Sequence, residues 1–125
     1  LSANNWALRT LYAEALLEGG QPRRALEELK AVVRLRPGNV RLYELLSQTA
    51  IKAGDKAATY RYRAEKLYAE GDLEPAIKQL EFALRQRDIR YHDAAQIQVL
   101  LDAMKEEQRD AKKRRDPLGL AAGGR

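Results

Sequence analysis

Apolar residues along the chain recur at intervals of three and four, which is the period of a helix that buries one face. In one segment Ala25, Leu26, Leu29, Val32 and Val33 form a single stripe at this spacing. The pattern predicts six helices, which cover about Trp6–Glu18, Pro22–Leu35, Val40–Ala53, Lys56–Glu70 and Leu73–Arg87, with the last beginning at His92 or Asp93. The predicted fold class is therefore all-α.

The last predicted helix is apolar in its first half only. Ala94, Ile97, Leu101 and Met104 form its inward stripe, and the residues after Met104 are polar on every side. A helix of this kind is expected to cap a stacked array. We therefore expect residues 1–90 to form the array, residues 91–115 the capping helix, and residues 116–125, rich in glycine and small residues, a disordered tail.

Three glycines mark the turns between the predicted helices at unequal intervals. Gly20, Gly54 and Gly71 are separated by 34 and then by 17 residues. Thirty-four residues is the length of a tetratricopeptide repeat, a helix–turn–helix unit that stacks into a superhelix. The shorter interval indicates one irregular half-repeat, in which a single helix follows one unit and begins another.

Comparison of the chain with itself supports a repeat. The segments Ala13–Arg34 and Ala64–Arg85 align without a gap and are identical at seven of 22 positions. The shared small and apolar residues fall where two packed helices meet, and they are Ala13/Ala64, Leu16/Leu67, Ala25/Ala76 and Leu29/Leu80. Buried alanines at such positions allow close approach of the two helices.

The same interval extends to the start of the chain. Leu1 and Asn5 lie 34 residues before Leu35 and Asn39. The segment Leu1–Asn5 is therefore expected to be the end of a preceding helix and its turn. On this interpretation the chain is a module of a longer protein.

The repeated unit resembles the tetratricopeptide consensus. The resemblance rests on Tyr12, Ala13, Leu16, Gly20, Ala25, Leu29 and Pro37. Arg9 stands where a tryptophan is common, and Val32 replaces the usual late alanine. The resemblance implies an α-α superhelix that binds proteins or peptides.

A second resemblance rests on four longer runs, which are Leu11–Leu17 with Gly20–Pro22, Arg41–Leu46, Ala64–Leu73 and Ala76–Leu84. These runs are similar to the C-terminal repeat region of bacterial periplasmic M48-type zinc metallopeptidases, of which the β-barrel assembly-enhancing protease is the best-known type. The resemblance covers about residues 5–113. In that family the zinc-binding His-Glu-x-x-His motif lies in an N-terminal catalytic half.

This resemblance implies a function for the chain as the non-catalytic companion of a protease. The chain has one histidine, His92, and no His-Glu-x-x-His, whereas a zinc site needs at least three protein ligands. We therefore expect no cofactor in this chain, with zinc in the parent protease domain. The implied partners are that domain of the same polypeptide and the outer-membrane assembly machinery, in the periplasm. A free-standing adaptor of an envelope or secretion complex is the alternative.

Composition limits the remaining functions. The 125 residues include no cysteine, which excludes disulfides and thiolate metal sites, and no apolar run approaches the roughly 18 residues of a membrane span. The net charge is +5, but segment 105–125 alone supplies seven basic and four acidic residues. Nucleic acid is therefore not an expected partner, although the basic run Lys112–Arg115 leaves weak polyanion binding as a third possibility.

The concave groove of the array is the predicted partner-binding surface, since the first helix of each unit lines it in tetratricopeptide folds. By register, the lining residues are Thr10, Glu14 and Glu18, then Arg41, Glu44, Gln48 and Lys52, then Arg61, Glu65 and Tyr68. Mixed charge with tyrosine favours an extended or helical protein segment as the ligand. A carboxylate clamp is not expected, because Glu14 would repel a terminal carboxylate.

Individual side chains give further expectations. Tyr12, Tyr43 and Tyr60 are expected in the core, and Tyr62 and Tyr91 at the surface. His92 is expected to be a polar residue at the start of the last helix. Neighbouring carboxylates such as Glu27/Glu28 and Glu106/Glu107 do not face one another on a helix, so no acid–base site is predicted.

Overall fold

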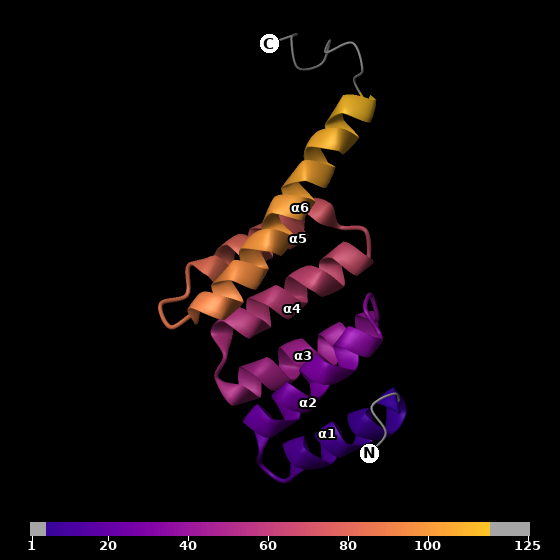
Figure 1. Cartoon of the computed structure of the whole chain (residues 1–125), viewed down its shortest axis with the longest axis vertical. Coiled ribbons are helices and arrows are strands. Elements are labelled where there is room, and N and C mark those ends of the chain that lie inside the picture. Colours follow the sequence, from indigo (N-terminus) through magenta and orange to yellow (C-terminus); the bar gives the residue numbers. More distant parts are fainter. Residues whose placement is uncertain (1–4, 116–125) are drawn as a thin grey trace.

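The computed structural model describes residues 5–115, and the predicted tail at 116–125 lies outside the described residues. The described part forms six helices joined by short turns (Figure 1). They are α1 (Trp6–Glu18), α2 (Pro22–Leu35), α3 (Val40–Ala53), α4 (Lys56–Ala69), α5 (Leu73–Leu84) and α6 (Tyr91–Arg115). The prediction of an all-α, repeat-like fold of six helices is confirmed.

Local capping explains where the helices begin. The side chains of Asn5, Asn39 and Asp55 each accept a hydrogen bond from the backbone N–H three residues later, at 3.1, 3.1 and 3.0 Å. Each bond satisfies one of the N–H groups that have no partner within the first turn of a helix. The side chains of these three residues therefore define the starts of α1, α3 and α4.

The predicted turn glycines adopt the backbone conformation that their role requires. Gly20, Gly54 and Gly71 have φ of 77°, 74° and 89°, in the left-handed region that other residues rarely occupy. This conformation reverses the chain after α1, α3 and α4. The 34- and 17-residue intervals are therefore real intervals between turns of the fold.

Three helix boundaries differ from the sequence prediction, and α4 ends at Ala69, one residue earlier than expected. α5 ends at Leu84, three residues earlier than expected, and α6 begins at Tyr91, slightly earlier than expected. At the end of α5 the N–H groups of Arg85 and Gln86 bond to carbonyls three residues back, and the Gln86 side chain donates to the carbonyl of Phe82 at 3.0 Å. These bonds satisfy the last carbonyls without another helical turn.

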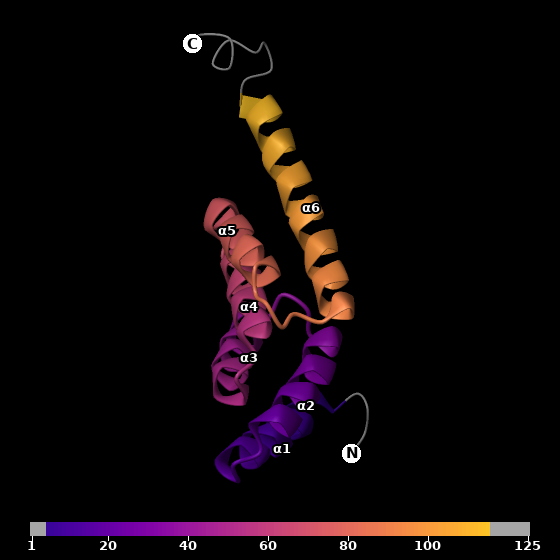
Figure 2. The same ribbon diagram turned by 90° about the vertical axis from the view of Figure 1, so that its left-hand side faces the viewer.

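Each helix packs antiparallel against the next one in the chain (Figure 1). Seen from the side, α3, α4 and α5 form one layer, and α6 lies to the right of that layer (Figure 2). The upper end of α2 leans toward the same side. α6 packs on α5, and its C-terminal half projects beyond the other helices.

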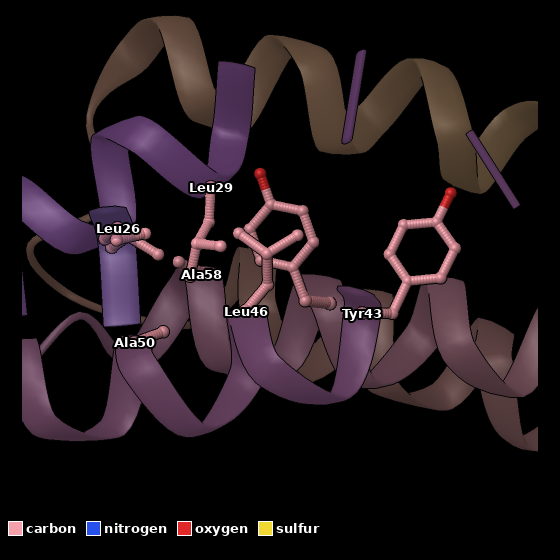
Figure 3. Close-up of a cluster of buried hydrophobic side chains, with 8 residues drawn as sticks. Leu26, Leu29, Tyr43, Leu46, Ala50 and Ala58 are labelled. Carbon is pink, nitrogen blue, oxygen red and sulfur yellow. The ribbon is translucent and has the colours of Figure 1, made fainter. Parts of the chain in front are cut away.

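The core divides into two clusters. The first cluster has buried members from each of the helices α1, α2, α3 and α4. Its labelled side chains from α2, α3 and α4 lie close together (Figure 3). In this cluster the rings of Tyr43 and Tyr62 lie 6.5 Å apart and nearly parallel. The second cluster joins α4, α5 and α6, and its buried members are Ala64, Ala76, Ile77, Leu80, Ala83, Ile97, Leu101 and Met104. α4 contributes to both clusters.

Two of the tyrosine predictions are wrong. Tyr62 is only 3% exposed, because α4 lies between α3 and α5 and must bury two faces. Tyr12 is 38% exposed and accepts a hydrogen bond from Arg24, because it lies on the outer face of the first helix. Tyr43 is buried and Tyr91 is exposed, as predicted. Tyr60 is partly buried and packs against the second cluster.

Candidate functional site

A groove of about 580 Å³ lies between α4 and α6. We call it the α4/α6 groove. Its lining residues come from the α2–α3 turn and α3 (Pro37, Gly38, Tyr43), from α4 (Glu65, Tyr68, Ala69) and from α6 (Leu100, Ala103, Met104, Glu107). A cavity of this size falls in the range of ligand-binding pockets.

Two hydrogen bonds join α4 to α6. Arg61 Nη1 donates to Gln96 Oε1 at 2.9 Å, and Tyr68 Oη donates to Glu107 Oε1 at 3.0 Å. The second bond joins two residues that line the groove, whereas Arg61 and Gln96 are not among its lining residues. Long side chains therefore hold α6 beside α4, and one of these bonds lies at the groove itself.

The walls of the groove are largely apolar. Leu100, Ala103 and Met104 of α6 form one wall, and Pro37 forms part of the other. Buried Ile97, Leu101 and Met104 fix α6 against the second core cluster, so the α6 wall is held by the core. The groove thus offers a preformed apolar surface, which is typical of ligand sites.

Tyr43 supplies a polar group at the edge of this surface. Its hydroxyl oxygen accepts a hydrogen bond from the backbone N–H of Gly38 at 2.9 Å. Burial is the main cause of the raised pKa of Tyr43, and the phenol is therefore well below its pKa and protonated at neutral pH. Because the oxygen is the acceptor in the Gly38 bond, the phenolic hydrogen can be donated to a ligand.

Two carboxylates lie on opposite sides of the groove. Glu65 of α4 is partly buried, and burial raises its pKa, although the neighbouring Arg61 guanidinium 3.2 Å away opposes this shift. Glu107 of α6 is exposed and holds the hydroxyl of Tyr68, a bond that raises the pKa of that tyrosine. Among the ten lining residues two are acidic and none is basic.

The ten residues predicted to line a groove do not share one surface. Glu65 and Tyr68 line the α4/α6 groove, and Arg61 is not among its lining residues but donates to Gln96 of α6. Arg41, Glu44 and Gln48 line a separate depression with Val40, Leu45 and Lys66. Lys52 is exposed at the end of α3. On α1, Glu14 and Glu18 are exposed, and the Thr10 hydroxyl donates to the carbonyl of Trp6.

The α3 depression is a compact polar cluster. Glu44 pairs with Lys66 of α4 at 3.1 Å and accepts a hydrogen bond from Gln48 at 2.9 Å. The bond from Lys66 is the main reason why the pKa of Glu44 is lowered. Glu44 and Gln48 are therefore already engaged with each other and with α4, and a different residue of α3, Tyr43, lines the α4/α6 groove.

Sequence reasoning missed the contribution of α6. Leu100, Ala103, Met104 and Glu107 line the groove, whereas this helix was expected only to cap the array. One signal was present in the sequence: Leu100 lies beside the inward stripe and is not needed to complete it. His92 is exposed in the first turn of α6, as predicted, with its Nε2 atom 3.1 Å from the Gln96 amide.

Residues 5–115 contain no helix that is both long and apolar enough to cross a membrane. No protein-family model matches the chain, and comparisons with curated proteins and with solved structures found no match either. The candidate site is therefore interpreted from its own geometry.

Proposed function

We propose that this chain is a tetratricopeptide-like interaction module that binds a segment of another protein in the α4/α6 groove. The observation that carries the proposal is the groove itself, a largely apolar hollow between α4 and α6 that is bordered by carboxylates and by the hydrogen bond from Tyr68 to Glu107. Stacked helical repeats use such surfaces to bind extended or helical segments. The module acts by holding its partner in a fixed place.

We propose further that the module is the non-catalytic companion of a periplasmic M48-type zinc metallopeptidase. The support is the resemblance of its sequence runs to the C-terminal repeat region of that family, together with the broken interval between Gly54 and Gly71. In this role the array docks on a protease half of the same polypeptide. The groove then holds partners or substrates of outer-membrane protein assembly close to the zinc site.

Site-specific photo-crosslinking in the native host tests the binding proposal. A photoreactive phenylalanine derivative at Ala103, which is exposed on the α6 wall, is expected to yield a discrete protein adduct. The same derivative at Lys78, exposed on α5 and outside the groove, is the control. Adducts of equal yield at both positions, or none at Ala103, would refute binding in the groove.

The metallopeptidase proposal has an independent test. Sequencing of the gene upstream of Leu1 is expected to show a signal peptide followed by His-Glu-x-x-His. A native N-terminus close to Leu1 would refute this assignment and favour a free-standing adaptor. Neither result depends on whether the groove binds a partner, so the two proposals stand or fall separately.

A further inference from the structure

The length of the α4/α6 groove limits what it can hold. The lining residues on α6 run from Leu100 to Glu107, about 10 Å along the helix. An extended chain advances about 3.3 Å per residue, so about three residues fit along this lining. A short extended segment therefore matches the site in size.

The charges at the groove favour a positively charged residue in that segment. Glu65 and Glu107 border it from opposite helices, and no basic residue is among its lining residues. Glu65 Oε2 accepts from Arg61, and Glu107 Oε1 accepts from Tyr68, so each carboxylate has a second oxygen that can accept a hydrogen bond from a ligand. A ligand cation would also offset the loss of solvent around Glu65.

The remaining surface of the groove suits an apolar side chain and a peptide backbone. Leu100, Ala103 and Met104 form a continuous apolar wall beside Glu107. The hydroxyl of Tyr43, whose oxygen accepts from Gly38, can donate its hydrogen to a backbone carbonyl. Apolar, acceptor and donor groups therefore lie within one short groove.

Resting on the proposed function, we infer that the α4/α6 groove recognises an extended protein segment in which a Lys or Arg is adjacent to a large apolar residue. The cation lies between Glu65 and Glu107, and the apolar side chain packs on the α6 wall. A backbone carbonyl of the segment accepts from Tyr43. Charge complementarity distinguishes this ligand from acidic segments.

Three synthetic peptides test the inference, and they differ only in the residues that flank their central leucines. Each is about seven residues long, so that the roughly three residues that fit along the groove are flanked on both sides. Each has capped ends and central leucines flanked by Lys, by Gln or by Glu. Fluorescence anisotropy with the full chain is expected to rank them in the order Lys, Gln, Glu, with about tenfold or more between the first and the last.

Variants locate the binding and assign the charge effect. Glu107→Gln and Glu65→Gln are each expected to lower the affinity for the peptide with Lys about tenfold, because each variant loses a charge-assisted hydrogen bond to the peptide. Glu74→Gln, exposed on α5, is the matched control and should leave the affinity unchanged. Ala103→Trp fills the groove and should abolish binding, whereas Lys78→Trp should not. Circular dichroism confirms that each variant is folded.

Each outcome has a defined meaning. Equal affinities for the three peptides, all lost in Ala103→Trp, would overturn the inferred charge selectivity and leave the groove as a protein-binding site. Preference for the Glu peptide would overturn the inference in the same way. Binding that persists in Ala103→Trp would place the peptide elsewhere and refute the inference, and crosslinking at Ala103 would then decide the proposed function on its own.

Discussion

Ala76 tests the close packing of α5 on the rest of the array. It is fully buried in the second core cluster, and neighbouring members Ala64 and Leu80 are also fully buried. Replacement of Ala76 by Leu adds three carbons at a position with no solvent-facing side. We therefore expect the larger side chain to force α5 away from its neighbours, at a cost in the free energy of unfolding.

The magnitude follows from known costs of overpacking. Extra methylenes in a tightly packed core destabilise a protein by about 1–3 kcal/mol. A domain of this size has a free energy of unfolding of about 5–15 kcal/mol. At about 4–8 °C per kcal/mol, the decrease in Tm of Ala76→Leu is expected to be between about 4 and about 20 °C. The variant should remain folded at room temperature.

Urea unfolding followed by circular dichroism measures this change. The midpoint of Ala76→Leu should fall while the m-value stays the same, since the surface exposed on unfolding is nearly unchanged. Ala15→Leu is the control: Ala15 is exposed on α1, and both residues favour helices, so the change should be within about 0.5 kcal/mol. A midpoint for Ala76→Leu equal to that of wild type would refute the packing of α5 described above.

Three further predictions concern single polar groups. Asp55→Ala should cost about 0.5–2 kcal/mol of unfolding free energy, because the side chain caps α4 at 3.0 Å. Asp72→Ala, whose side chain makes no capping bond, should cost less, and equal losses would contradict the capping role. Burial raises the pKa of Tyr62 to about 12, so a rapid alkaline pH jump should show a late-ionising tyrosine that Tyr62→Phe removes. Burial raises the pKa of Glu65 above 4.5 in the fold, so its stabilising contribution is present below that pH and is lost as pH rises through the raised pKa. The stability of Glu65→Gln relative to wild type should therefore increase with pH across that window, and a constant difference in urea midpoints would contradict the shift.

The helices could be predicted because their signals are local. Gly54 and Asp55, for example, end α3 and begin α4 by backbone conformation and by a side-chain bond to the next turn. The burial of Tyr62 is not a local property. Its side chain lies away from the main apolar stripe of α4, and only the position of α4 between two neighbouring helices shows that this face is also covered.

The groove depends on tertiary arrangement in the same way. Helical register places Arg41 and Tyr43 on different faces of α3, but it does not show which face borders the groove. That choice depends on where α6 stands, and α6 is positioned by Ile97 and Leu101 against the second core cluster. The helical register named Glu65 and Tyr68 of α4, which line the groove, whereas on α3 it named Arg41, Glu44 and Gln48, which line a separate depression.

The 17-residue interval between Gly54 and Gly71 connects the irregular repeat to the site. Within this interval α4 packs against α3 on one side and α5 on the other, with Ala58 in the first core cluster and Ala64 in the second. A helix covered on two sides keeps only a narrow edge for other contacts. On α4 that edge includes Glu65, which borders the groove and is therefore partly desolvated. The shared helix thus places at the groove a carboxylate that is paired with Arg61 through one oxygen and can bind a ligand cation through the other.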